Sequence, residues 1–213
     1  FAFYAVKWSE AWPRRLRIRY RPSWPASAGR AGRHSGLSHR RAETPGKIVL
    51  NGSSQLYIGG DYLVVSGLRF EGGALPDNRH VVQFRGEDGH AHHSRLTETA
   101  IIDYNPENWR TEGKWVSLYG THNRIDHSYF AGKTHDGATV VVWLDGDPNY
   151  HRIDNNFFGP RPLLGKNGGE SIRIGTSDWS MSDSETLVEH NLFYRNNGEH
   201  EIISNKSGKN VYR

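Results

Sequence analysis

The chain has 213 residues, of which 35% are hydrophobic, and carries a formal net charge of +4. This length and composition allow one domain with a substantial core and exclude a disordered chain. No apolar run approaches the roughly 20 residues that span a bilayer, so we expect no membrane partner. The absence of cysteine removes disulfides and leaves the redox compartment open.

Basic charge is concentrated at the N-terminus. Residues 1–41 contain nine arginines and one lysine against Glu10 alone, which gives +9, and the remainder carries −5. An arginine-rich arm can bind nucleic acid, but this stretch has no supporting motif or periodicity, so we expect no nucleic-acid partner. Its abrupt junction with patterned sequence resembles a shifted reading frame. We therefore divide the chain into an aberrant segment, 1–41, with poor order over roughly 10–40, and a folded domain, 42–213.

Short apolar strands recur from residue 47 onward, and 24 glycines favour frequent turns. Taking one apolar marker from each repeat, the steps are 34, 25, 31 and 30 residues; the markers are Val82, Val116, Val141, Ile172 and Ile202. Such a period indicates stacked coils that share one core. We predict an all-β fold, a right-handed parallel β-helix truncated at its C-terminus. A propeller would need hairpin turns that the sequence lacks.

Two acids and one lysine near the C-terminus suggest a site. If residues 201–204 form a strand, Glu199 and Glu201 point to one face while Ile202 packs on the other. Paired acids are stable when water solvates them, in which case Glu199, Glu201 and Lys206 are simply three surface charges. They are also stable when a hard cation lies between them. A cation would also disfavour the ammonium form of Lys206 and prepare it to accept a proton.

Stacking the markers places the preceding coil beside these acids. If Ile172 stacks on Ile202, Asn167 or Glu170 approaches Glu199 and Glu201. Amide and carboxylate oxygens without cysteine or paired histidines favour calcium over zinc. The expected cofactor is therefore Ca²⁺.

Four segments carry a resemblance to a known family: GDYLVVSGLRF (60–70), FAGK (130–133), NGGESIRIG (167–175) and NGEHEIISNKS (197–207). From about residue 42 to its end the chain resembles polysaccharide lyase family six, the β-helical alginate lyases and chondroitinase B. The resemblance implies that Asn167, Glu199 and Glu201 bind calcium and that Lys206 is the catalytic base. It also implies that an arginine about one coil after Lys206 acts as the general acid.

The sequence departs from the family pattern because it contains no arginine at the position expected for the general acid. The chain stops at Arg213, seven residues after Lys206, which is too early for the acid. We therefore expect an N-terminal fragment of the lyase domain with little or no turnover, since loss of an assisting acid costs roughly 10²–10⁴ in rate. Arg173, Lys133 and Glu170 are predicted to contact the substrate.

Three other groups of residues were weighed. Residues 145–149 begin like a calcium loop, but Tyr150 and Asn156 occupy positions that the motif reserves for glycine and glutamate, so we read a corner turn. Residues 90–93 hold three histidines without partners at ligand spacing, which favours a loop. Asp126 and Asp154 fall at equivalent places and could mimic the paired acids of a glycoside hydrolase.

The predicted partner is an acidic polysaccharide, with alginate first and dermatan sulfate second. A non-catalytic β-helix that binds acidic glycans remains an alternative. A polymer too large to enter a cell implies a secreted or periplasmic protein, although no export signal is visible. We expect a monomer.

Overall fold

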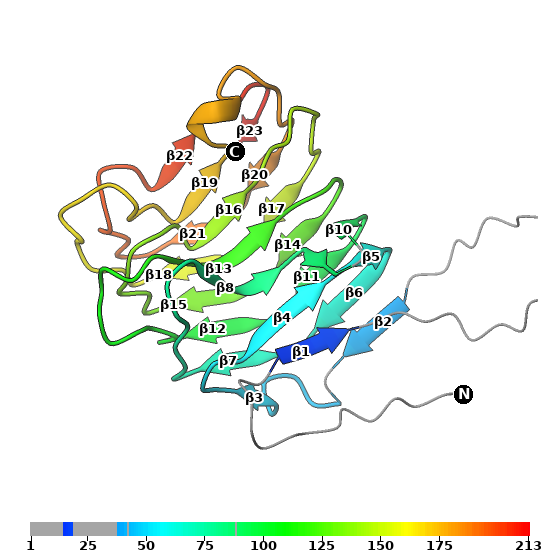
Figure 1. Cartoon of the computed structure of the whole chain (residues 1–213), viewed down its shortest axis with the longest axis vertical. Helices are drawn as coiled ribbons and strands as arrows, with labels where there is room; N and C mark the ends of the chain where they lie inside the picture. Colours follow the sequence, from blue (N-terminus) through cyan, green and yellow to red (C-terminus); the bar gives the residue numbers. More distant parts are fainter. Residues whose placement is uncertain (1–14, 19–37, 42, 88) are drawn as a thin grey trace, which may run out of the picture.

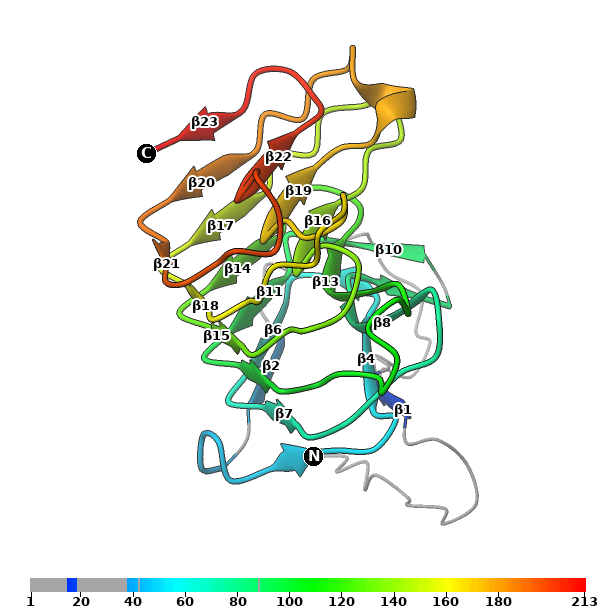
Figure 2. The same cartoon turned by 90° about the vertical axis from the view of Figure 1, so that its left-hand side faces the viewer.

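The computed structural model describes residues 15–18, 38–41, 43–87 and 89–213. Three parallel sheets wind around one axis, and consecutive coils stack along it (Figure 1). The fold is a parallel β-helix, as predicted. Viewed from the side, one sheet after another contributes a strand to each coil (Figure 2). No helix in the described ranges is long and apolar enough to cross a membrane.

Each large sheet takes one strand from each coil. Sheet A contains, in spatial order, β1 (Arg15–Ile18), β4 (Gln55–Ile58), β8 (Arg79–Gln83), β13 (Gly113–Leu118), β16 (Val140–Val142), β19 (Ile172–Ile174) and β22 (Ile203–Asn205). Sheet B contains β2 (Ser38–Arg41), β6 (Leu63–Ser66), β11 (Arg95–Thr97), β14 (Arg124–Asp126), β17 (Arg152–Asp154), β20 (Leu187–Glu189) and β23 (Val211–Tyr212).

Sheet C completes each coil before the chain returns to sheet A. It contains β3 (Val49–Leu50), β7 (Arg69–Glu71), β12 (Ala100–Ile102), β15 (Tyr129–Ala131), β18 (Phe157–Gly159) and β21 (Leu192–Phe193). A small sheet joins β5 (Gly60–Asp61), β9 (Arg85–Gly86) and β10 (Gly89–His92). A 3₁₀ turn, η1, spans Ser177–Trp179.

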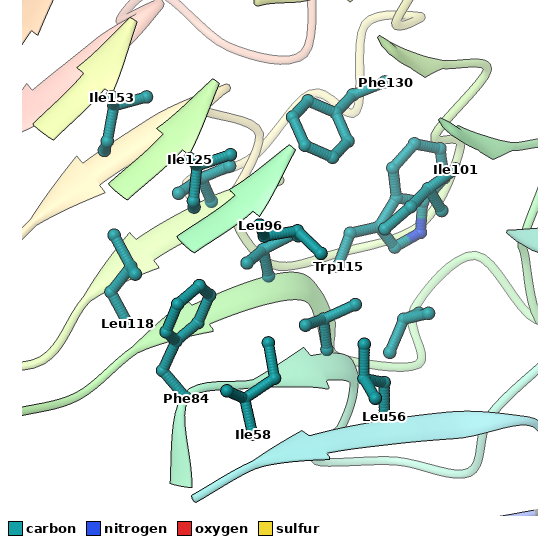
Figure 3. Packing of buried hydrophobic residues seen from close by; sticks show 14 of the residues in the cluster. Leu56, Ile58, Phe84, Leu96, Ile101, Trp115, Leu118, Ile125, Phe130 and Ile153 are labelled. Atoms are coloured by element: carbon teal, nitrogen blue, oxygen red, sulfur yellow. The ribbon is translucent and has the colours of Figure 1, made fainter. Parts of the chain in front are cut away.

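The core is built from the inward residues of all three sheets. Figure 3 shows Leu56 and Leu118 of sheet A facing Ile125 of sheet B and Phe130 of sheet C. Within sheet C the inward rings stack from coil to coil, with 5.2 Å between the centres of Phe130 and Phe158. Burying each such side chain contributes about 1.5–3 kcal/mol, which explains why a short apolar strand suffices in every coil.

The corners between sheets B and C are two residues long. The first residue has a positive φ, as in His127 (47°) and Asn155 (55°), and the second points inward. Asn156 illustrates the inward position, since its backbone N–H donates to the side-chain oxygen of Asn191 in the next coil at 3.0 Å. Asn155 is therefore a left-handed turn residue, and Asn156 belongs to a side-chain ladder between coils.

The predicted markers are wrong by one residue in two coils. Val116 pairs with Val140 rather than Val141, and Ile172 pairs with Ile203 rather than Ile202. Ile202 is 42% exposed and does not pack in the core. A run of consecutive apolar residues fits either register, so alternation could not decide between them.

The prediction of poor order over residues 10–40 lies mostly outside the described residues. The described pieces at 15–18 and 38–41 are β1 and β2, which pair in parallel with β4 and β6.

Candidate active site

The predicted acids lie where the chain passes from sheet C to sheet A, which we name the C–A corner (residues 132–139, 160–171 and 194–202 in successive coils). Glu199 is fixed there, because one carboxylate oxygen accepts hydrogen bonds from the backbone N–H groups of Gly168 (2.7 Å) and Gly169 (3.1 Å). A Cβ atom on Gly169 would lie 2.3 Å from the carbonyl carbon of Gly198. Only glycine allows the two coils to approach this closely.

Asn167 and Glu201 flank this contact. Both are exposed, and neither side chain donates or accepts a hydrogen bond within the described residues. Extending the strand register places Glu201 beside Glu170 rather than Ser171, because the pairing is shifted by one residue. The structure therefore brings Glu199 against the Asn167 loop, as predicted, and leaves Asn167 and Glu201 able to turn toward a ligand.

Glu170 carries an unusual buried carboxylate. The residue is 1% exposed, and its Oε2 atom has no hydrogen-bond partner in the described part of the chain. Burial raises the pKa of Glu170, and the charge of Glu199 raises it further. An unpaired carboxylate oxygen beside a second carboxylate is the environment that a hard cation stabilises. The oxygen donors of this corner therefore fit calcium, although no three His, Asp or Glu side chains already converge as a metal cluster among the described residues.

Lys206 lies on the outer face of sheet A. Its backbone N–H donates to the carbonyl of Ile174 at 2.8 Å, which continues the β19–β22 ladder by one residue. The side chain is half-buried, and its ammonium group forms no hydrogen bond or ion pair with any described residue. An amine without an internal partner is available to a ligand.

Arg161 holds the C–A corner together and was missed by the sequence analysis. The side chain is 2% exposed and its guanidinium group donates to carbonyl oxygens of Glu170 (2.7 Å), Gly137 (2.9 Å) and Gly168 (3.2 Å). Burial lowers the pKa of Arg161 to about 10. Because these carbonyls belong to loops of two coils, Arg161 fixes the loop that supports Glu199.

The prediction that Lys133 contacts the substrate is wrong. Its side chain is 2% exposed, and its ammonium group donates to the carbonyls of His135 (2.9 Å) and Asp136 (3.1 Å). Burial holds the pKa of Lys133 well below its usual value. Lys133 therefore serves to shape the corner.

Arg173 occupies a different environment from Lys133. It lies on β19 with 17% of its side chain exposed, and its Nη1 is 3.6 Å from Oε1 of Glu170. Its guanidinium carbon lies 5.6 Å from the ring centre of Trp143, which the sequence analysis did not consider. Arg173 can reach a ligand on the outer face of sheet A, whereas buried Glu170 faces Arg173 and the corner.

The alternative pair Asp126 and Asp154 lies on sheet B, in ion pairs. Both side chains are fully buried, and Asp154 accepts two hydrogen bonds from Arg124 at 2.7 and 2.6 Å. Arg95 pairs with Asp126 in the same way one coil earlier. Arg213 continues the ladder, donating to Glu189 at 2.7 Å. Carboxylates neutralised in this way are structural, which argues against the hydrolase reading.

The histidine segment 90–93 and the turn at 145–149 also have structural partners. His93 stacks between Tyr62 (4.9 Å) and His122 (4.6 Å) at an outer corner. Asn149 closes the predicted turn at 145–149, where its side chain donates to the carbonyl of Gly120 at 2.9 Å.

The described residues thus combine a parallel β-helix, carboxylate oxygens at the C–A corner and a lysine without a partner among them on the outer face of sheet A, groups that suit an acidic polymer. A family model described as Chondroitinase B matches residues 31–213. The chain therefore belongs to this family, which includes the polysaccharide lyases of family six. The match begins within the segment that the sequence analysis set apart as aberrant.

Solved structures agree with this assignment. The PL6 family alginate lyase AlyGC is 49% identical, with a TM-score of 0.80 over 84% of this chain and 25% of its own. A mannuronic acid specific family 6 lyase from human gut microbiota is 43% identical, with a TM-score of 0.79 over 83% of this chain and 41% of its own. A PL6 polysaccharide lyase from Pseudopedobacter saltans is 31% identical, with a TM-score of 0.75 over 84% and 41%.

The chain thus spans between a quarter and about two fifths of the length of these lyases. No curated protein sequence matches the chain at a significant level.

Proposed function

We propose that the protein is a polysaccharide lyase that cleaves a uronate polymer, most simply alginate, by calcium-assisted β-elimination. The observation that carries the proposal is the C–A corner, where Glu199 is fixed and a carboxylate oxygen of Glu170 is buried without a partner, next to the outer face that presents Lys206. Family membership and the lyase neighbours support the reaction class.

Asn167, Glu199 and Glu201 would hold the ion. When bound, calcium would neutralise the uronate carboxylate and stabilise the charge that develops as the C5 proton leaves. Glu199 is oriented for this by its two backbone hydrogen bonds, so binding requires only Asn167 and Glu201 to turn.

Lys206, as the free amine, would accept the proton from C5 of the uronate. The electron pair of the C5–H bond forms a C4–C5 double bond, and the C4–oxygen bond breaks with its electrons on the bridging oxygen. That oxygen takes a proton from an acid, which the family resemblance assigns to an arginine one coil after Lys206. Arg213 is unsuited to this role because it pairs with Glu189 on sheet B.

The substrate choice rests on the neighbours. AlyGC is described as an alginate lyase, and the gut enzyme as mannuronic acid specific. The name of the family model, Chondroitinase B, favours dermatan sulfate as the second candidate. Both polymers are too large to enter a cell, so we propose a secreted or periplasmic protein.

The test is the ultraviolet absorbance of newly formed unsaturated uronides, using the full-length gene product with alginate or dermatan sulfate, with calcium or with chelator. We expect a calcium-dependent rise on alginate and a loss of roughly 10²–10⁴-fold for Lys206→Ala. A rise that persists in Lys206→Ala would refute the assigned base. No rise on either polymer, together with unchanged glycan binding by Lys206→Ala, would favour the non-catalytic alternative.

A further inference from the structure

An ion pair joins two loops of the C–A corner. The ammonium group of Lys166, in the second loop, donates to Oδ2 of Asp136 in the first. Oδ1 of Asp136 accepts from the backbone N–H of Gly137 at 2.7 Å. Only 11% of the Asp136 side chain is exposed, against 44% of that of Lys166. The acid is therefore fixed, and it holds a lysine that would otherwise be free to move.

Gly168 brings this pair close to the proposed calcium ligands. A Cβ atom on Gly168 would collide with Oδ1 of Asp136, and the N–H of the same residue donates to Oε2 of Glu199 at 2.7 Å. The two carboxylates therefore contact Gly168 from the coils on either side of it. Lys166 lies two residues before Gly168, in the loop between the two acids.

The Glu199 carboxylate keeps one oxygen available to a cation. Its Oε2 accepts from Gly168 and Gly169, whereas its Oε1 accepts no hydrogen bond from the described part of the chain. An ammonium group on a long flexible stem is a compact cation that forms strong hydrogen bonds with such an oxygen. An ammonium group and a calcium ion cannot occupy this oxygen together, so the two would compete for Glu199.

The field of the corner would draw a released ammonium group inward. Burial lowers the pKa of Arg161 to about 10, and the charges of three acids oppose this shift. The acids are Glu170, Asp136 and Glu199. Arg161 does not neutralise them by direct contact, because its guanidinium group donates to backbone carbonyls. The three carboxylates therefore share one small region, and Lys166 is an exposed cation beside it.

We propose that Asp136 is a positioning residue of the calcium site, which restrains the ammonium group of Lys166 and so keeps it from competing with calcium for Glu199. This inference rests on the proposed function, since it takes Glu199 as a ligand of the ion. If Lys166 paired with Glu199 nine times in ten, only about one site in ten would be free, and the apparent Kd for calcium would rise about tenfold.

A simple loss of negative charge predicts a different pattern. Removing the charge of Asp136 weakens the attraction for calcium whether or not Lys166 is present. In that case the effects of changing the two residues add, and Lys166→Ala strengthens binding by the same factor in either background. If Asp136 acts by restraint, Lys166→Ala matters little while Asp136 holds the lysine and matters greatly once that hold is lost.

The test measures the Kd for calcium by calorimetry, using the full-length gene product without polysaccharide, as wild type, Asp136→Asn, Lys166→Ala and the double variant. Asp136→Asn keeps the oxygen that accepts from Gly137 and removes only the charge. It should raise the Kd about tenfold, and Lys166→Ala alone should change it less than about twofold. The double variant should return to within about twofold of wild type.

The matched control is Asp183→Asn. Asp183 pairs with Lys209 at 2.7 Å in the corner between sheets A and B, so its loss should leave the Kd for calcium unchanged. Thermal unfolding with chelator present should show that every variant is folded before calcium is added.

The outcomes separate the two proposals. A wild-type Kd for Asp136→Asn, or a weakening that persists in the double variant, would overturn the role of Asp136 and leave the calcium site intact. Equal effects of Lys166→Ala in both backgrounds would also overturn it, because charge alone would then explain the data. A wild-type protein that binds no calcium would overturn both proposals.

Discussion

Replacing Arg161 by alanine tests whether one buried cation holds the C–A corner. The side chain satisfies the carbonyls of Glu170, Gly137, His135 and Gly168 at 2.7 to 3.2 Å. The carbonyls of Glu170 and His135 keep a second donor, the N–H of Thr139 (3.2 Å) and the ammonium group of Lys133 (2.9 Å). The other two lose their only described donor, and each buried carbonyl left without a donor costs about 1–3 kcal/mol, so the upper limit is about 2–6 kcal/mol.

Two effects reduce this limit. The guanidinium group no longer has to be desolvated, and water can enter the space that alanine leaves. Removing one partner of a buried charged network typically costs about 3–5 kcal/mol, which we take as the expected loss. A domain of ordinary stability has about 5–15 kcal/mol, so the variant should fold but unfold at a much lower urea concentration.

The assay combines urea unfolding with hydrogen exchange. Exchange should rise in residues 132–139 and 160–171, which contain the four carbonyls, and stay unchanged in β14 and β17 of sheet B. Arg161→Lys is the control: it keeps the charge but cannot reach four carbonyls, so its loss should fall between those of wild type and Arg161→Ala. A loss below about 1 kcal/mol for Arg161→Ala, or a rise in exchange over all coils alike, would refute the reasoning.

Three further predictions concern charge. Calcium at 100 times its Kd should stabilise the protein by about 2.7 kcal/mol. Glu199→Gln should abolish this gain without unfolding the protein, because the amide oxygen can still accept hydrogen bonds from Gly168 and Gly169. Equal stabilisation of wild type and variant by calcium would exclude Glu199 as a ligand. Burial raises the pKa of Glu170, so ionisation of this carboxyl costs stability as the pH rises through that value. With chelator present, Glu170→Gln should therefore unfold at a higher temperature than wild type at pH 7. The variant should show no such gain once acid has protonated Glu170 in the wild-type protein. Burial alone would raise the pKa of Asp126, but its hydrogen bonds to Arg95 and His127 outweigh this and lower the pKa below 3.8. The stability that ionised Asp126 contributes is therefore present above that pH and is lost as the pH falls further. Asp126→Asn should reduce the loss of stability in acid, and an unchanged loss would contradict the assignment.

The fold could be predicted because every coil repeats the same requirement. Each strand supplies inward residues such as Ile125 and Ile153, and the repeat of this pattern identifies the β-helix without knowledge of the corners. Glu199 could be placed beside Gly168 for the same reason, since neighbouring coils stack in register. These features depend only on local pattern and spacing.

Register and buried cations could not be predicted. With Val141 taken as the marker, Trp143 falls beside inward Leu118, whereas the true pairing through Val140 places it beside outward Tyr119. The stack of Tyr119 on Trp143 can therefore not be foreseen from the predicted register.

Lys133 shows the limit for charged side chains. Its partners are the carbonyls of His135 and Asp136, and carbonyl positions depend on loop conformation rather than on residue type. Arg161 was missed for the same reason, because its four acceptors come from backbone groups of two loops. Sequence patterns record side chains, so they cannot reveal a cation that is bound by the main chain.

Buried acids are fully paired on sheet B but not at the C–A corner, and this difference favours the corner as the ligand-binding site. On sheet B, Asp154 lies fully buried between guanidinium groups that match its charge, which stabilises the stack and leaves nothing for a ligand. At the C–A corner, Arg161 donates to backbone carbonyls, including that of Glu170, rather than to the Glu170 carboxylate, so this carboxylate keeps an oxygen without a partner among the described residues. Such a group costs stability in the free protein, and under our proposal a bound cation would recover the loss. The C–A corner is therefore where we expect ligand binding to stabilise this chain most.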